Sequence, residues 1–314
     1  MKYRKLGHSG LKVSEIALGS WLTYGGYVER KNAEDSIRKA YDLGINFFDT
    51  ANFYEGGEAE KIVGGVLKEY PRESYVLATK AFFPMGDGPN DRGLSRKHIV
   101  EQCHASLRRL AVDYVDVYYC HRFDPETPLE ETLRAIDDLV TQGKILYVGV
   151  SEWSAVQMAE ALALADRYLL DRIVVNQPVY NLFKRGIETS VIPFCTQKGI
   201  GQVVFSPLQQ GILTGKYKSA ADIPQGSRAA RFADMRNGIT EERLEKVRQL
   251  SAVADELGIP LSQLALAWIL RQPNVASALI GASRPEQVEA NAGASGIVLP
   301  LDVLACIEQI LRGA

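Results

Sequence analysis

The chain has 314 residues, of which 46% are hydrophobic and 24% charged, a composition typical of a globular protein with a sizeable core and not of disordered or collagen-like chains. Its net charge is −2 and its Lys and Arg residues are scattered, so the basic surface expected of a nucleic-acid-binding protein is missing. No apolar run approaches the roughly 20 residues that span a bilayer, and the start of the chain has no apolar signal core, so we expect a cytoplasmic protein without a membrane partner.

The first residues predict a β-hairpin. Residues 2–14 alternate polar and apolar side chains around the turn-forming sequence Gly-His-Ser-Gly at 7–10. Because this segment stands outside the repeat that follows, we expect it to form an N-terminal cap.

From residue 16 onward, short apolar strands alternate with amphipathic helices. The strands are predicted at 16–21, 45–49, 75–80, 114–120, 145–150, 173–176, 202–205 and 277–280. The helices are predicted at 32–43, 58–68, 95–110, 128–142, 154–165, 186–198, 240–257 and 261–271, with Thr127 as the N-cap of the fourth.

Eight strand–helix units in one uninterrupted chain predict a fold of the α/β class, a single (β/α)8 TIM barrel domain over residues 1–314. A doubly wound open sheet is the alternative, but the G-x-G-x-x-G typical of its dinucleotide sites does not follow the first strand. Residues 209–237 lack periodicity and are rich in Gly, Arg and Lys. Because loops of that length usually bind something, we expect long ligand-binding loops at the C-terminal face.

Ionisable side chains stand where three consecutive strands end. These are Asp49, Lys80 and His121, and Tyr54 follows Asp49 in the next loop. A barrel brings strand ends together around one axis, so we expect these side chains to meet. Each alone has a structural explanation, such as a salt bridge or loop packing, but their joint occurrence favours a catalytic site. Further polar groups at strand ends are Ser151, Asn176, Gln177, Ser206 and the segment 281–283.

The four residues suit proton delivery to a carbonyl oxygen. A phenol has a pKa near 10, but a nearby ammonium stabilises the phenolate, so we expect Lys80 to lower the pKa of Tyr54. Asp49 would hold Lys80, and His121 would donate to a substrate oxygen or share the proton. A metal-dependent barrel hydrolase or isomerase is a weaker alternative, because the chain has only four His and no paired carboxylates at the predicted strand ends.

Several motifs together resemble the aldo-keto reductase superfamily over essentially the whole chain. They are Asp-Thr-Ala-x-x-Tyr (49–54), Ala-Thr-Lys (78–80), His-Arg (121–122) and Gly-Val-Ser (149–151). Three longer motifs are similar to the bacterial reductases related to potassium-channel beta subunits: Gly-Ser-Trp (19–21), Ser-Pro-Leu-x-x-Gly-x-Leu-Thr-Gly-Lys-Tyr (206–217) and Gly-Ala-Ser-x-x-Glu-Gln-Val-x-x-Asn (281–291).

The resemblance implies an NADP-dependent oxidoreductase, EC 1.1.1.-, that reduces small aldehydes or ketones without a metal. Tyr54 would be the general acid, tuned by Lys80 and Asp49, and His121 would orient the carbonyl while reduced nicotinamide supplies a hydride. Channel beta subunits carry Asn where this chain has His121, which favours the enzymatic branch. A nicotinamide-sensing binding subunit with vestigial catalysis is the alternative, and a homo-oligomer is left open.

By the same resemblance, the last two strand–helix loops bind the cofactor. Ser151 and Gln177 would hold the carboxamide, and Lys216 with Arg228 would neutralise the pyrophosphate above the 205–211 loop. Helical spacing places Ser283, Gln287 and Asn291 on one face at a helix start, where the adenine-ribose phosphate would lie. The expected cofactor residues are Gly19, Ser20, Trp21, Asp49, Ser151, Gln177, Phe205, Ser206, Pro207, Leu208, Gly211, Lys216, Arg228, Gly281, Ser283, Gln287 and Asn291.

The resemblance also bears on which nucleotide binds and which residues contact the substrate. Many family members carry a cation at the position of Gln287, and Arg284 is the only cation nearby, so NAD is the alternative nucleotide. The expected substrate contacts are Trp21, Tyr24, Tyr54 and His121, with Phe53, Phe82, Phe83 and Met85 as further apolar candidates.

Overall fold

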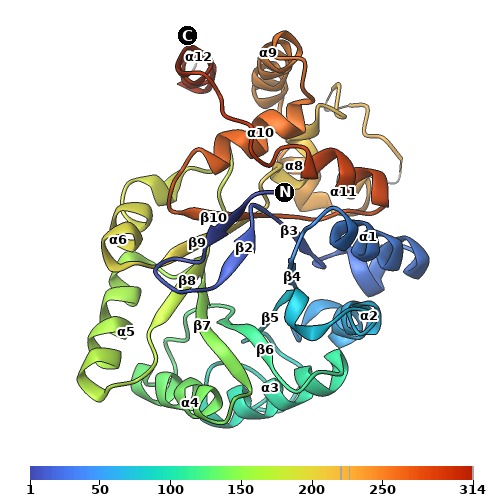
Figure 1. Ribbon diagram of the computed structural model, residues 1–314. Coiled ribbons are helices and arrows are strands. Elements are labelled where there is room, and N and C mark those ends of the chain that lie inside the picture. Colours follow the sequence, from blue (N-terminus) through green and yellow to red (C-terminus); the bar gives the residue numbers. More distant parts are fainter. Residues whose placement is uncertain (220, 226, 313–314) are drawn as a thin grey trace.

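The computed structural model describes residues 1–219, 221–225 and 227–312, except for the side chains of Arg228 and Asp234. Eight parallel strands close into a barrel in which β10 pairs with β3, and helices surround it (Figure 1). The expected (β/α)8 barrel is therefore confirmed. Its strands are β3 (Ile16–Gly19), β4 (Phe47–Asp49), β5 (Val76–Ala81), β6 (Val115–Cys120), β7 (Ile145–Ser151), β8 (Ile173–Gln177), β9 (Gly201–Phe205) and β10 (Val275–Ile280).

The helices alternate with the strands as expected. They are α1 (Arg30–Asp42), α2 (Glu58–Leu67), α3 (Arg96–Leu110), α4 (Leu129–Thr141), α5 (Ala155–Tyr168) and α6 (Val191–Lys198). The connection from β9 to β10 contains α7 (Arg228–Arg231), α8 (Ala233–Asn237), α9 (Glu241–Glu256) and α10 (Leu261–Leu270), and α11 (Pro285–Ala292) and α12 (Leu301–Arg312) follow β10.

Local capping decides where some helices begin. The prediction that Thr127 caps α4 is wrong: its hydroxyl donates to Asp124 at 2.8 Å, and Pro128 takes the N-cap position. By contrast, Ser154 forms a capping box with Gln157 at the start of α5. The helix predicted at 186–198 is divided into a 3-10 turn (Gly186–Glu188) and α6.

The long connection and the C-terminus hold more helix than the sequence predicts. Residues 209–237 are not irregular throughout, since they contain a 3-10 segment (Gln209–Thr214) as well as α7 and α8. The last helix, α12, lies outside the predicted elements and packs against α9 (Figure 1). Its apolar Leu304, Ile307 and Leu311 recur with helical spacing, a signal that could have revealed it.

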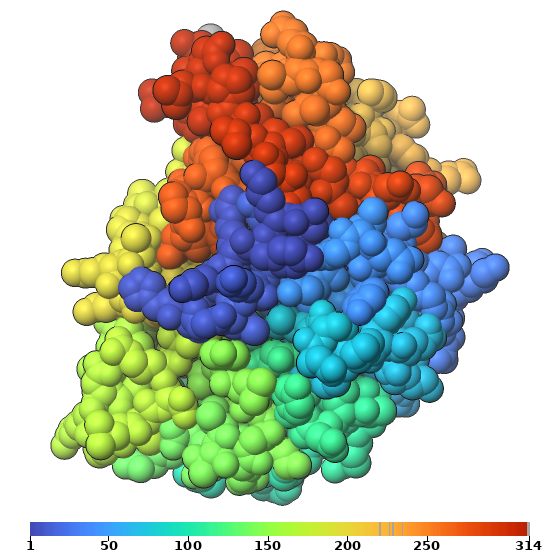
Figure 2. Space-filling model, in the orientation of Figure 1, coloured from blue at the N-terminus to red at the C-terminus, as the bar shows by residue number. Residues whose placement is uncertain are grey.

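The N-terminal hairpin closes one end of the barrel. Strands β1 (Tyr3–Lys5) and β2 (Lys12–Ser14) pair antiparallel, which confirms the predicted hairpin cap. Leu6 and Val13 are fully buried among the side chains of the barrel interior. Figure 2 shows the dark-blue N-terminal residues lying across the middle of this face. Ligand access is therefore left to the opposite end, where the strands terminate.

Strand alternation sorts the barrel interior into an apolar bottom and a polar top. Inward-facing Phe47 of β4 and Val76 and Ala78 of β5 belong to the apolar interior cluster. Successive inward side chains are two residues apart, so the next ones toward the C-terminal end are Asp49 and Lys80. The strand period thus places this ion pair on top of a close-packed apolar layer.

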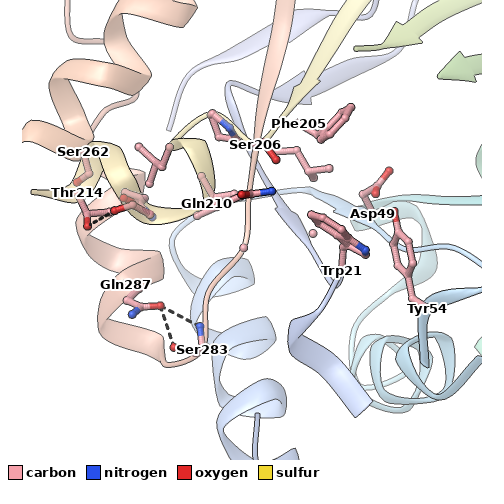
Figure 3. A pocket seen from close by; sticks show the side chains of 18 of the residues that line it. Trp21, Asp49, Tyr54, Phe205, Ser206, Gln210, Thr214, Ser262, Ser283 and Gln287 are labelled. Carbon is pink, nitrogen blue, oxygen red and sulfur yellow. Dashed lines mark hydrogen bonds between the residues drawn. The ribbon is translucent and has the colours of Figure 1, made fainter. Parts of the chain in front are cut away.

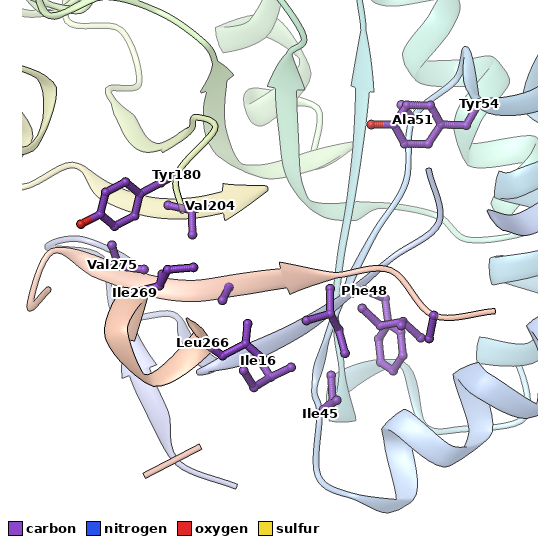
Figure 4. Packing of buried hydrophobic residues seen from close by; sticks show 14 of the residues in the cluster. Ile16, Ile45, Phe48, Ala51, Tyr54, Tyr180, Val204, Leu266, Ile269 and Val275 are labelled. Atoms are coloured by element: carbon purple, nitrogen blue, oxygen red, sulfur yellow. The ribbon is translucent and has the colours of Figure 1, made fainter. Parts of the chain in front are cut away.

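A second hydrophobic cluster fills the space between the barrel and its helices. In Figure 4, Ile16 of β3 lies beside Leu266 of α10, and Phe48 of β4 lies near Ile45. Full burial of one such side chain stabilises a fold by about 1.5–3 kcal/mol relative to exposure. In residues 1–219, 221–225 and 227–312, no single helix has the length and apolarity to cross a bilayer; α9 and α10, bent by 89°, pass only as a pair and only by length and composition.

A buried ion pair ties two helices to the strand that carries Lys80. Glu60 of α2 is fully buried, and it accepts hydrogen bonds from Arg109 of α3 and from Thr79 of β5, both at 2.5 Å. The Arg109 side chain also packs on Gly57, where an added Cβ would lie 2.6 Å from its Cδ and where φ is +95°. Only glycine suits this position, because it needs both a left-handed backbone and close approach.

We expect Arg109→Met to lower the free energy of unfolding by about 3–5 kcal/mol, because it leaves the Glu60 carboxylate buried without its cation. Urea unfolding of the purified chain would measure the loss. As a control, Arg134→Met breaks an exposed ion pair with Glu130 and should lower the free energy of unfolding far less than Arg109→Met does. Equal losses in the two variants would contradict the structural role of the buried pair.

Candidate active site

The site is built on a fully buried ion pair between adjacent strands. The Lys80 ammonium of β5 donates to the Asp49 carboxylate of β4 and to the Thr50 carbonyl oxygen, the latter at 2.8 Å. Gln177 of β8, from across the barrel, donates to the second Asp49 oxygen at 2.9 Å. Because both charges are desolvated, these hydrogen bonds are what make burial of the pair tolerable.

Tyr54 reaches this pair from the loop after β4. That loop continues the ladder onto β5, since the backbone N–H of Thr50 donates to Ala78 and that of Asn52 donates to Lys80. The Tyr54 hydroxyl oxygen consequently lies 3.4 Å from the Lys80 nitrogen. The sequence prediction that Tyr54, Lys80 and Asp49 meet is correct in geometry.

His121 completes the group from the end of β6. Its Nε2 lies 3.5 Å from the Tyr54 hydroxyl, while its Nδ1 is buried and has no hydrogen-bond partner. Its backbone N–H donates to Ala81 at 3.1 Å, which fixes it at the end of the strand. The Tyr54 oxygen therefore lies between an ammonium and an imidazole nitrogen.

Burial sets the protonation states of the two rings. It raises the pKa of Tyr54 well above its usual value near 10, and the Asp49 charge acts in the same direction. The expected lowering of that pKa is thus not found, because desolvation and the Asp49 charge outweigh the Arg122 guanidinium, which acts to lower it. Burial, together with the Lys80 and Arg122 charges, holds the pKa of His121 well below 6.5. At neutral pH the phenol keeps its proton and the imidazole is uncharged.

Burial also shifts the pKa values of the two members of the ion pair. Burial raises the pKa of Asp49 and lowers that of Lys80, and the attraction between the two groups acts against both shifts.

The two polar groups expected to hold a carboxamide lie beside the pair. Ser151 donates to the Gln177 carbonyl oxygen at 2.9 Å, so these two side chains are held together at the ends of β7 and β8.

A cavity of about 860 Å³ opens beside Tyr54 and extends across the C-terminal face. Figure 3 shows Trp21, Asp49 and Tyr54 at one end, Ser283 and Gln287 at the other, and Ser206 and Gln210 between them. Of the expected cofactor residues, those in its wall are Gly19, Trp21, Asp49, Ser151, Gln177, Phe205, Ser206, Pro207, Leu208, Gly211, Lys216, Gly281, Ser283, Gln287 and Asn291.

The far end of the cavity is polar, and some of its hydrogen-bonding groups have no partner among the described residues. The Ser283 backbone N–H and hydroxyl donate to the Gln287 side-chain oxygen at 2.9 and 3.2 Å. Ser283 precedes Arg284, the N-cap residue of α11, so it is not itself the cap. In the part of the chain that the structure describes, neither the Asn291 amide nor the Lys216 ammonium has a hydrogen-bonding or ionic partner. Lys216 lies against Gly211, where an added Cβ would come within 2.8 Å of its nitrogen.

These observations fit a nicotinamide dinucleotide. The cavity has the size of a ligand site, and a free ammonium beside a glycine loop suits a pyrophosphate. Asn291 lies near the C-terminal end of α11 and not at the helix start expected from the sequence, but its unpaired side-chain amide can donate to a phosphate oxygen. In the described residues, there is no group of three or more His, Cys, Asp or Glu side chains placed to hold a metal ion.

Several expected residues lie elsewhere. Tyr24 does not form a substrate wall, because its ring is 1% exposed and packs in the core between barrel and helices. Ser20 is buried beneath the cavity and donates to Thr50 at 2.9 Å. Arg228 begins α7, but its side chain lies outside the described part of the structure. Among the aromatic candidates, Phe53 and Phe83 line the cavity, whereas Phe82 and Met85 do not. Asn176 is buried and donates to Gln202 at 3.4 Å.

The cavity wall also contains residues without an expected role. They are Tyr27, Arg122, Gln210, Thr214, Pro224, Gln225, Ser227, Ser262, Leu279, Ile280 and Ala290. Gln210 and Thr214 fall inside the 206–217 motif, which could have identified them. Ser262 comes from the start of α10, and its local sequence offers no such signal.

A barrel that joins a Tyr, Lys, Asp and His set to a ligand-sized cavity at its strand ends defines a class, the barrel enzymes. This chain belongs to the aldo/keto reductase family, whose model matches residues 15–312. It is 46% identical over 320 positions to an Arabidopsis thaliana protein named "Probable voltage-gated potassium channel subunit beta", covering 99% of this chain and 97% of that protein. A protein of the same name from Oryza sativa subsp. japonica is 42% identical, with the same coverage.

We expect the His121 imidazole to remain neutral when the pH falls through its reference pKa of 6.5, because burial and the Lys80 and Arg122 charges lower its pKa well below that value. Long-range ¹⁵N–¹H NMR spectra recorded from pH 8 to 5 would show this, with His121→Asn assigning the signal. Since the unfolded chain protonates this group near pH 6.5 and the folded chain does not, acidification through that value should favour unfolding. A titration midpoint at 6.5 or higher would contradict the buried, cation-flanked position.

Proposed function

We propose that this protein is an NADPH-dependent reductase of aldehydes and ketones in which Tyr54 gives its proton to the carbonyl oxygen. The observation that carries the proposal is the position of the Tyr54 hydroxyl, 3.4 Å from the Lys80 nitrogen and 3.5 Å from His121 Nε2, in the wall of a cavity that suits a dinucleotide. Membership of the aldo/keto reductase family supports an oxidoreductase activity.

Tyr54 and Lys80 have different roles in the proposed reduction. When bound, NADPH supplies the hydride that reduces the carbonyl carbon. The Tyr54 hydroxyl is available as an acid at neutral pH because burial keeps it protonated. As the proton leaves, negative charge develops on the phenol oxygen, and the nearby Lys80 ammonium stabilises it in a low-dielectric site.

The neutral His121 ring has a different task. Its Nε2 faces the same oxygen as Lys80, so in the tautomer protonated at Nε2 it can donate to the substrate oxygen and align it with Tyr54. Asp49 takes no proton in this scheme. It keeps Lys80 charged and holds it in place through the ion pair.

Tyr54→Phe should lower kcat by about 10²–10⁴-fold, the usual contribution of a general acid. NADPH affinity should stay within about twofold, because the missing hydroxyl serves the chemistry and not the phosphates. NADPH oxidation with 4-nitrobenzaldehyde and NADPH fluorescence titration would measure the two effects. The matched control is Tyr3→Phe, which removes a hydroxyl of the N-terminal hairpin that donates to the Gly44 carbonyl oxygen. This variant should keep wild-type kcat. Undiminished carbonyl reduction by the Tyr54 variant would rule out the proposed role.

Lys216→Met should weaken NADPH binding by about 10- to 100-fold, since a charge-assisted contact to phosphate is lost. The wild-type protein should bind NADPH more tightly than NADH, and its affinity for NADPH should fall with added salt. Fluorescence titration with each nucleotide, at several ionic strengths, would test the nucleotide preference and the salt dependence. Lys218→Met, which removes a cation that does not line the cavity, should bind like wild type. Similar dissociation constants for the two variants would contradict the pyrophosphate assignment.

A second candidate is a nucleotide-binding subunit of a potassium channel with little turnover. The names of the two plant relatives favour it, since both are described as channel beta subunits. It predicts tight NADPH binding without useful reduction of 4-nitrobenzaldehyde or methylglyoxal. The complete Asp49, Tyr54, Lys80 and His121 set favours the reductase.

A further inference from the structure

Arg122 places a guanidinium in the wall of the catalytic end of the cavity. It follows His121 directly after β6 and lines the same cavity as Tyr54. One terminal nitrogen, Nη1, donates to the His121 carbonyl oxygen at 2.5 Å and lies 3.4 Å from the Ser151 hydroxyl. The guanidinium carbon lies 5.4 Å from the centre of the Phe83 ring. These contacts hold the side chain beside the reacting groups.

No carboxylate neutralises Arg122 in the described part of the chain. The only acidic residue in the cavity wall there is Asp49, and its two oxygens are already engaged by Lys80 and Gln177. The Nε and Nη2 donors of Arg122 have no hydrogen-bond acceptor among the described residues. A partly buried guanidinium with free donors attracts an anion, and it matches the planar geometry of a carboxylate.

Phe83 lies beside this cation, and further aromatic side chains line the same cavity. Phe83 lies edge-on to His121 at 4.8 Å between ring centres, and Phe53 lies 5.2 Å from Phe83. Trp21 and Phe53 are 37% and 43% exposed, and both line the cavity. A ligand that packs on these rings would have its carbonyl near His121 and Tyr54 while another part of it reaches Arg122. The local chemistry therefore suits an apolar or aromatic body that carries a negative charge.

We propose that Arg122 binds a carboxylate of the substrate, so that this reductase prefers carbonyl compounds that also carry a carboxylate group. The inference rests on the proposed reductase function of the same site. It assigns separate roles to two cations of the cavity wall: Lys216, beside Gly211, serves the nucleotide phosphates, and Arg122, beside His121, serves the substrate. Arg122 is then a specificity-determining residue and takes no part in the proton transfer.

The test compares acids with their neutral esters. At saturating NADPH, kcat/KM is measured for 2-, 3- and 4-formylbenzoate and for the three matching methyl formylbenzoates. For at least one isomer the wild-type protein should prefer the acid, and Arg122→Met should lower the acid-to-ester ratio by about 10- to 100-fold. Arg122→Lys, which keeps the charge and loses the planar fork, should lower the ratio by less. Because the ester is measured in the same variant, a general loss of activity cancels in the ratio.

Arg248→Met is the control, because it removes an exposed arginine of α9 and should keep the wild-type ratio. The inference is overturned if the wild-type ratio is near one for all three isomers, or if Arg122→Met leaves the ratio unchanged. It is also overturned if Arg122→Met weakens NADPH binding and leaves substrate preference intact, since Arg122 would then serve the nucleotide.

Failure of the proposed function would give a different result. If the wild-type protein binds NADPH but reduces none of the six aldehydes, the reductase proposal fails. Calorimetric binding of formylbenzoate and its ester to the protein saturated with NADP⁺ then still decides the role of Arg122. Tighter binding of the acid that is lost in Arg122→Met supports a carboxylate site, and equal binding of acid and ester refutes it.

Discussion

The buried ion pair of Lys80 and Asp49 is the interaction on which the rest of the site depends. Removing two charges from water costs several kcal/mol per ion, so the pair persists only where hydrogen bonds compensate it. The barrel supplies them from separate strands: Thr50 and Gln177 each satisfy one partner. Closure of the sheet is what brings β8 opposite β4, so an open sheet with the same strands would leave Asp49 with an unmatched oxygen. The apolar layer below excludes water and raises the strength of every polar contact above it.

Tyr54 is positioned by backbone constraints around that pair. The loop that carries it is held to β5 by ladder hydrogen bonds, and the turn that follows takes left-handed φ values at Glu55, Gly56 and Gly57. A non-glycine residue in that region costs free energy, which the surrounding packing must offset. The Arg109–Glu60 pair braces the same turn against the strand of Lys80, so general acid and ammonium are fixed by one connected set of contacts. Such rigidity suits a proton transfer whose rate depends on geometry within about 0.5 Å.

The charges of the cavity are strongly asymmetric. Its one acid among the described residues is neutralised within the catalytic group, whereas Lys216 and Arg122 face the open volume without carboxylate partners. Anionic groups are therefore favoured near both cations, and the aromatic rings at the catalytic end add an apolar surface beside Arg122. Burial and the charges of Lys80 and Arg122 keep His121 neutral, which leaves its ring free to donate a hydrogen bond without competing for the Tyr54 proton.

The sequence by itself determined the barrel and the meeting of the catalytic residues. Short apolar runs and amphipathic helical spacing are local signals, and the ends of parallel strands lie on the same side of a barrel, so Asp49, Lys80 and His121 could be placed together from one chain. The type of a residue did not decide whether its side chain is buried. Tyr24 and Trp21 are both aromatic residues of the loop after β3, but of these two only Trp21 lines the cavity. The pKa of Tyr54 and the unpaired state of Arg122 likewise depend on which groups arrive from distant strands and on how much water they exclude. Those are properties of the packed interior, and only the tertiary structure decided them.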